Sequence, residues 1–209
     1  MTRNGSLLTI LLLAVGGCSA ILPLQTPIAP VAADWRQAAT SDDRERLRGW
    51  RNAFVSGLRA ARAAGHGEAL SREGALLDPD AAITGGAIPN GDYRCRVIKL
   101  GAKSVGLLDY VAYPAFACRI GPQAGRQALT KLSGSQRYVG VILPGDALRQ
   151  LFLGTLVLGD EPSALQYGRD RERDVAGFIE RIGPARWRML MPRPHFESQM
   201  DVLELVPAA

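Results

Sequence analysis

The chain has 209 residues, of which 47% are hydrophobic and 22% are charged, with a formal net charge of +5. This composition is typical of a globular domain and excludes a wholly disordered chain, a collagen-like fibre and a polytopic membrane protein. The basic residues are spread along the sequence, which is not the pattern of a nucleic-acid-binding surface. The three cysteines are too few for a disulfide-rich scaffold.

The N-terminal segment has the pattern of an export signal. Arg3 supplies a positive charge, and the apolar run at 7–15 is far shorter than the roughly 20 residues of a membrane-spanning helix. The run VGGC, which ends at Cys18, resembles the lipobox of bacterial lipoproteins, where the cysteine is acylated and the chain is cut before it. We therefore expect a lipoprotein signal peptide at 1–17 and a lipid anchor at Cys18. The alternative is a plain secretory signal that contains a cysteine.

The expected location of the protein follows from the residues after the cleavage site. Ser19, in place of Asp, favours the outer membrane over the inner membrane by resemblance to known lipoproteins. Residues 18–33 contain three prolines among small and apolar residues, which predicts a semi-extended tether. The protein is expected at the periplasmic face of the outer membrane, with one folded domain over 34–209.

One amphipathic helix is predicted at about 41–64. Thr40 followed by Asp43 matches a capping box, and Gly65 is a suitable residue just past the helix end. Apolar residues recur at three- and four-residue spacing, namely Leu47, Trp50, Phe54, Leu58 and Ala61. This apolar face is expected to pack against the domain core; lying on a membrane surface is the alternative.

The second half of the chain predicts a mainly β fold. Residues 66–90 carry turn signals and no steady periodicity, so they are expected to form a loop region. Short strands are then expected at 93–100, 110–120, 128–132, 137–143, 150–158, 175–182, 186–191 and 201–206. Eight successive strands over 91–209 favour an antiparallel up-and-down β-barrel, lipocalin-like in architecture, because closure removes the sheet edges. A two-sheet sandwich is the alternative.

Cys95 and Cys118 fall in two successive predicted strands. Export into an oxidising compartment favours a disulfide between them, and facing residues on paired strands lie close to disulfide distance. A metal pair and a nucleophilic cysteine remain as alternatives, although neither cysteine has an adjacent histidine.

The sequence shows none of the common catalytic signatures. It has no G-x-S-x-G motif, no complete phosphate loop and only two histidines, so no catalytic residue, metal site or cofactor is predicted.

Two groups of residues are candidates for binding. The connection between two predicted strands holds Asp160, Glu161, Tyr167, Arg169 and Asp170. Such connections at a barrel mouth often bind ligands, and paired carboxylates also suit acid–base chemistry; a solvated, structurally paired loop is the alternative. Arg94 and Arg96 share one face of the first strand. They would contact an anionic ligand if that face is the lumen, and are surface charges if it is the outside.

Several segments resemble one uncharacterised bacterial family. GDYRCRVIKLG, YPAFACRIG, LTKLSGSQR, LFLGTLVLGDE, YGRD and RIGPARWR are similar to the domain of unknown function 4893, found in exported alphaproteobacterial proteins. The resemblance spans nearly the whole mature domain and implies no activity or catalytic residues. The first strand also resembles, over that strand alone, small periplasmic barrels related to lipocalins and lysozyme inhibitors.

These observations predict a non-catalytic lipoprotein with a β-barrel-like domain. The membrane is the expected partner of the N-terminal lipid. The domain is expected to bind an envelope protein, a glycan or a small anionic or lipophilic ligand, and not nucleic acid. An envelope hydrolase that uses the loop carboxylates and a structural envelope spacer are the alternatives.

Overall fold

The computed structural model describes residues 34–159 and 161–208. Cys18, the predicted signal peptide and tether, and Asp160 lie outside the described residues. The N-terminal part is helical, with α1 (Trp35–Ala38), α2 (Ser41–Arg48), α3 (Trp50–Ala63), α4 (Gly67–Glu73) and a 3₁₀ helix η1 (Gly74–Leu77). No helix among the described residues has the length and apolar character needed to cross a bilayer.

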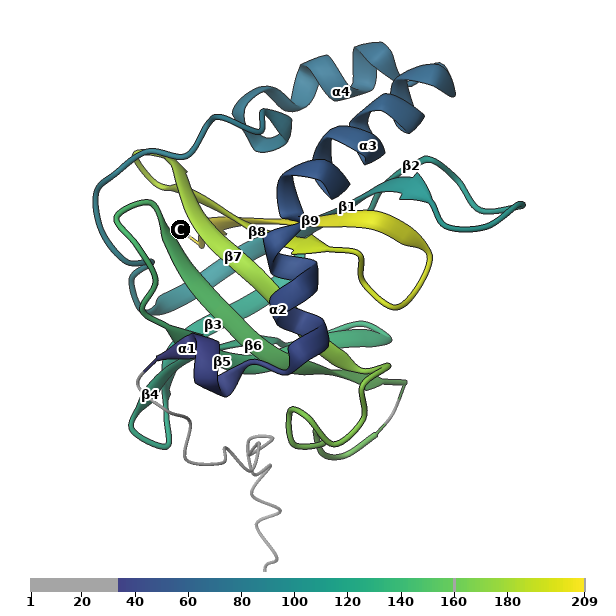
Figure 1. The fold of residues 1–209 in the computed structure, drawn as a ribbon. Helices are drawn as coiled ribbons and strands as arrows, with labels where there is room; N and C mark the ends of the chain where they lie inside the picture. Colours follow the sequence, from purple (N-terminus) through teal and green to yellow (C-terminus); the bar gives the residue numbers. More distant parts are fainter. Residues whose placement is uncertain (1–33, 160, 209) are drawn as a thin grey trace, which may run out of the picture.

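The remainder forms a closed antiparallel β-barrel (Figure 1). Its strands are β1 (Gly91–Ala102), β3 (Phe116–Gln123), β4 (Arg126–Lys131), β5 (Gln136–Leu143), β6 (Arg149–Leu158), β7 (Asp174–Gly183), β8 (Arg186–Pro192) and β9 (Ser198–Pro207). Each strand pairs with the next in this series, and β9 pairs back onto β1 along most of its length. A short extra strand, β2 (Tyr110–Ala112), pairs with the end of β1. The predicted barrel is thus confirmed, with one strand added.

Three local predictions differ from the structure. The single helix predicted at 41–64 is two helices, because the chain bends at Gly49 so that α2 packs on β7 while α3 packs on β1. The predicted loop region after Gly65 contains α4 and η1. The predicted strand at 110–120 is interrupted at 113–115. Pro114, at the centre of this interruption, has no backbone N–H to donate to the sheet.

The barrel lumen is filled with side chains. Inward-facing residues alternate along each strand and form one apolar cluster that includes Phe152, Trp187 and Met189. Gly140 and Gly154 lie opposite each other on β5 and β6, and a Cβ built on either would lie within 2.7 Å of the Phe152 ring carbon Cζ. The two glycines therefore leave the space that this ring occupies.

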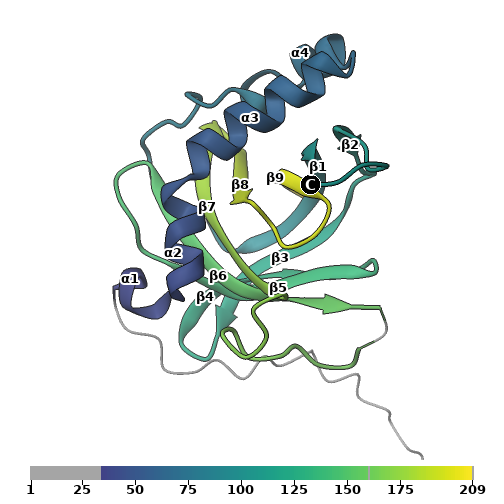
Figure 2. The ribbon, with the colours of Figure 1, turned by 45° about the vertical axis from the view of Figure 1, so that its right-hand side comes forward.

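The helices cover the outer wall of the barrel (Figure 2). α3 packs on the outward residues of β1, β8 and β9, while α1 and α2 pack on those of β5, β6 and β7. Arg188 of β8 is fully buried beneath η1, where it binds Glu180 at 2.7 Å and donates to the carbonyl oxygens of Ala75, Leu76 and Asp78. This buried pair fixes the α4–η1 segment on the wall.

The two ends of the barrel differ. At one end Ile88 is buried, its N–H donates to Gln150 Oε1 at 2.8 Å, and its carbonyl accepts from Gln127 Nε2 at 2.7 Å, so the segment before β1 closes the lumen. The opposite end carries the connections 103–115, 132–135 and 193–197 and the described residues 161–173 of the connection between β6 and β7. We call this the open end.

Candidate binding site at the open end of the barrel

A small polar cavity lies inside the open end. Its lining includes inward-facing Lys99, Tyr138 and Asp201 from the barrel wall, Asp174 at the start of β7, and His195 from the β8–β9 connection. The cavity measures about 30 Å³, which is room for about one or two water molecules. The lumen therefore holds polar groups at one end without holding a ligand-sized space.

Lys99 and Asp201 form a buried ion pair across β1 and β9, where they face each other in register. The Lys99 Nζ lies 3.0 Å from Asp201 Oδ2 and 3.0 Å from Glu197 Oε2, and Ser198 Oγ donates to the other oxygen of Asp201. Burial alone would lower the pKa of Lys99, but the two carboxylates raise it. The lysine therefore stays charged and ties the β8–β9 connection to the barrel wall.

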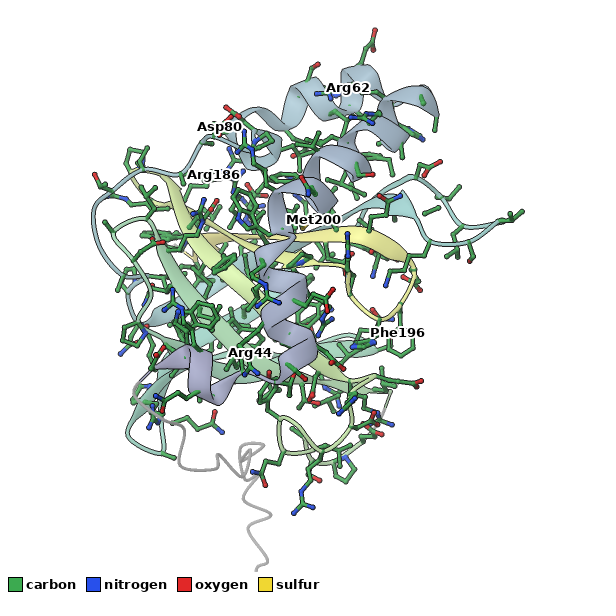
Figure 3. The ribbon with its side chains drawn as sticks, in the orientation of Figure 1. Arg44, Arg62, Asp80, Arg186, Phe196 and Met200 are labelled. Atoms are coloured by element: carbon green, nitrogen blue, oxygen red, sulfur yellow. A yellow bond between two sulfur atoms is a disulfide. The ribbon has the colours of Figure 1, made fainter. Side chains whose placement is uncertain are left out.

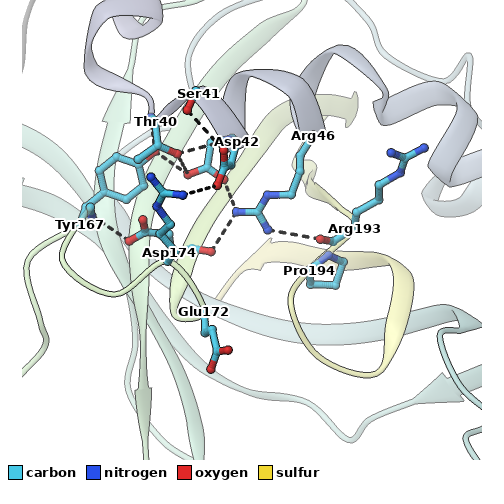
Figure 4. Close-up of polar contacts among 12 residues, drawn as sticks. Thr40, Ser41, Asp42, Arg46, Tyr167, Glu172, Asp174, Arg193 and Pro194 are labelled. Carbon is cyan, nitrogen blue, oxygen red and sulfur yellow. Dashed lines mark hydrogen bonds and ion pairs between the residues drawn. The ribbon is translucent and has the colours of Figure 1, made fainter.

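A second polar network joins α2 to the open-end connections (Figure 4). Tyr167 Oη donates to Asp43 Oδ2 at 2.5 Å and accepts the N–H of Thr40 at 3.0 Å. Arg46 binds Asp43 and donates to the carbonyl oxygens of Asp174, at 3.1 Å, and of Arg193, at 3.3 Å. α2 is thereby held to β7 and to both adjacent connections.

The Asp174 carboxyl of this network is only partly satisfied by hydrogen bonds. Oδ1 accepts the N–H of Gly168 at 2.8 Å, whereas buried Oδ2 has no hydrogen-bond partner. Burial, with the nearby Asp43 carboxylate, raises the pKa of Asp174 to about 6. The pKa of His195 is lowered by burial and by the neighbouring charges of Arg46 and Lys103. At neutral pH the open end thus combines a carboxylate whose charge burial disfavours with a neutral imidazole.

The rim of the open end exposes apolar side chains. Most of the large apolar residues exposed among the described residues lie on its connections, namely Val105, Leu107, Leu108, Tyr113, Leu132, Leu165 and Phe196. Half-buried Lys131 lies among them, with its Nζ 4.1 Å from the centroid of the Phe116 ring and 5.8 Å from that of Tyr138. Burial, together with the charges of Lys99 and Arg137, lowers the pKa of Lys131.

The structure places the predicted loop residues in different surroundings. Glu161 binds Arg173 Nη1 at 2.6 Å and the N–H of Leu158 at 3.0 Å, which holds the connection against the end of β6. Asp170 accepts the N–H of Glu172 and pairs with Arg173, Tyr167 points to α2 as described above, and Arg169 has an exposed side chain. These residues do not converge on one cavity.

Arg94 and Arg96 face outward from β1. Arg96 binds Glu204 and Glu73, with 2.9 Å between Nη1 and Glu73 Oε1, so it connects the wall to α4. Arg94 is exposed on the same outer face. The two arginines therefore do not reach the lumen.

The predicted disulfide between Cys95 and Cys118 is present, with a Cα–Cα distance of 6.0 Å. Both sulfurs are buried in the lumen cluster, where they link β1 to β3. Within the described ranges, no group of three or more His, Cys, Asp or Glu side chains is arranged to hold a metal ion.

Sequence reasoning missed the residues that line the cavity. Lys99 continues the inward alternation of Cys95 and Val97, and Asp201 precedes inward Leu203 by two residues. Extending the alternation of inward and outward residues to the charged ends of β1 and β9 would have predicted that Lys99 and Asp201 both face the lumen. Asp174 and His195 carry no comparable signal, because their burial depends on how α2 and the β8–β9 connection fold over the barrel end.

The fold and site together define a small, closed antiparallel barrel with a filled lumen and a helical cover. The family model described as "Domain of unknown function (DUF4893)" matches residues 35–205, and the chain belongs to this family. No curated protein and no solved structure gave a significant match.

Proposed function

We propose that this protein is a lipid-anchored binding module of the bacterial envelope, and that a protein partner binds at its open end. In this proposal Cys18 carries the lipid that holds the domain at the periplasmic face of the outer membrane. The observation that carries the proposal is the concentration of exposed apolar side chains on the rim of the open end. Exposed apolar clusters of this kind mark interaction surfaces in soluble domains.

The filled lumen supports a protein partner over a lipophilic ligand. Small-molecule pockets generally measure about 300–1,000 Å³, whereas the cavity at the open end measures about 30 Å³. Aromatic Tyr113 and Phe196 and aliphatic Leu132 come from three different connections around this cavity. Lys131 adds a cation that no described carboxylate neutralises through an ion pair, and a partner carboxylate would complement it.

The surroundings of the loop carboxylates support binding over hydrolysis. A general acid or base must be within hydrogen-bond reach of the proton it transfers. Glu161 already accepts from Arg173 and from the backbone, Asp170 accepts from the backbone, and the Tyr167 hydroxyl is directed at Asp43. The hydrolase alternative would need these groups to leave their present contacts.

Site-specific cross-linking in cells tests the open-end surface. A photoreactive amino acid at Leu132 or at Phe196 should give a discrete covalent adduct with a partner protein. The control position is Leu148, an exposed leucine on the connection between β5 and β6 at the closed end. An adduct from position 148 alone, or equal adducts from both ends, would refute the proposed surface.

Membrane fractionation tests the proposed anchor. The wild-type protein should partition into the detergent phase and fractionate with outer membranes, because two or more acyl chains give stable anchoring. Cys18→Ser should abolish both properties. A wild-type protein that is already found in the soluble periplasmic fraction would contradict the lipoprotein proposal.

A further inference from the structure

A groove lies on the outer wall of the barrel, between α3 and the connections 103–115 and 193–197. It measures about 580 Å³, which is within the usual range for small-molecule sites. Its polar lining consists of Asn52, Ser56, Arg59, Lys103, Arg193 and Gln199. Gly57 and Gly101 bring α3 close to β1 beneath this groove, since a Cβ on Gly101 would lie 2.9 Å from Gly57 Cα and from Gln199 Cδ.

The three cations of the groove come from three separate elements. Arg59 belongs to α3, Lys103 follows β1, and Arg193 follows β8. Among the described residues, no carboxylate lines the groove or lies within ion-pair distance of these cations. Many other arginines of the chain do have such partners, for example Arg51 with Asp80. The groove therefore keeps an uncompensated positive charge.

Arg193 is held at the groove in an unusual backbone conformation. Its φ of 48° is in the left-handed region, which residues with a side chain seldom adopt. Its N–H donates to the Gln199 carbonyl at 2.8 Å, and its own carbonyl accepts from Arg46 at 3.3 Å. Strained residues that are fixed by their surroundings occur preferentially at functional sites.

The electrostatics around Lys103 favour an anionic ligand in the groove. Burial lowers its pKa, and the charge of Arg46 lowers it further, as do those of Arg193 and Lys99, against an opposing effect of Asp201. Its ammonium group donates to the carbonyl of Pro194, which leaves other protons for a ligand. A concave surface lined by charges of one sign concentrates ions of the opposite sign.

We propose that this groove binds a phosphate-bearing anion, either as the headgroup of a lipid or as a soluble phosphorylated sugar. The guanidinium groups of Arg59 and Arg193 offer paired donors that match phosphate oxygens, and Lys103 adds a third cation. Asn52, Ser56 and Gln199 supply neutral donors for the remaining oxygens or hydroxyls. This site lies on the wall beneath α3, so it goes beyond the partner surface proposed at the rim.

Two probes test the site and distinguish the two sources of the phosphate, a soluble sugar phosphate and a lipid headgroup. Amide chemical shifts are followed by NMR during titration with glucose 6-phosphate at constant ionic strength, and vesicles of phosphatidylglycerol or phosphatidylcholine are used in co-sedimentation. The test variant is Arg59→Gln/Arg193→Gln. The control is Arg62→Gln, which removes an exposed charge from the same helix outside the groove (Figure 3). Thermal melting confirms that each variant is folded.

The wild-type protein should bind at least one of the two phosphate probes, with shifts or protection centred on 52–59 and 193–199. The double variant should weaken that binding by about tenfold or more, which corresponds to about 1.4 kcal/mol, while Arg62→Gln leaves it nearly unchanged. Binding of the sugar phosphate identifies a soluble source, and binding of phosphatidylglycerol vesicles alone identifies a headgroup. Equal losses in the double variant and the control, or binding of neither probe, would overturn the proposal. None of these results depends on a partner at the open end.

Discussion

Replacing both Cys95 and Cys118 with alanine should lower the free energy of unfolding by about 5 kcal/mol. The two residues are 23 positions apart, and the chain-entropy model gives about 3.4 kcal/mol for closing a loop of that length. Each replacement also deletes one buried sulfur from the filled lumen, which adds roughly 0.8 kcal/mol by comparison with a buried methylene.

Urea unfolding followed by circular dichroism measures this loss. The midpoint should fall, and the dependence of the free energy on urea should become steeper, because the unfolded chain without its cross-link exposes more surface. Mass spectrometry without reductant should first show the two residues linked in the wild-type protein. A loss below about 1 kcal/mol, with an unchanged slope, would show that the bond restricts the unfolded chain very little, contrary to this prediction.

Three further predictions concern single positions. Burial raises the pKa of Asp174 to about 6, above its unfolded value of about 4, so the unfolded state binds fewer protons between these values. The stability of the wild type relative to Asp174→Asn should therefore rise by about 2 kcal/mol as the pH falls from about 7 to about 4, and parallel urea-denaturation profiles would contradict this. Tyr167→Phe removes two bonds to α2 and should cost about 1–3 kcal/mol in thermal unfolding, whereas Arg169→Ala at an exposed side chain should cost less than about 0.5 kcal/mol. Gly154→Ala places a Cβ 2.4 Å from a backbone oxygen and should cost about 1–3 kcal/mol, while Gly67→Ala, in open space, should be nearly neutral.

The architecture of the barrel was largely predictable from the sequence. Inward and outward residues alternate along each strand, and this period survives in the structure because one face of each strand is buried in the lumen. The break at Gly49 was not predictable from periodicity, since the apolar spacing continues through it while the two helices pack on different strands. The interruption of the predicted strand at 110–120 had a local signal, because Pro114 cannot donate to a sheet. A prediction from periodicity alone passes over this residue.

The open-end site was only partly predictable. The loop that carries Tyr167 was correctly placed between two strands, but the contact of this side chain with Asp43 joins residues 124 positions apart. No local pattern indicates such a contact. Burial of Lys99 and Asp201 is opposed by their charge. Their pairing across β1 and β9, together with the contacts from Glu197 and Ser198, makes it tolerable.

The most direct test of the open-end surface combines one cross-linking position with two leucine variants. A photoreactive amino acid at Phe196 is used in chains that also carry either Leu132→Glu, on the open-end rim, or Leu148→Glu, at the closed end. Both leucines are exposed, so neither change should disturb folding by more than about 0.5 kcal/mol. Leu132→Glu should remove most of the adduct, whereas Leu148→Glu should leave it unchanged. Equal adduct yields from the two variants would contradict a partner surface at the open end.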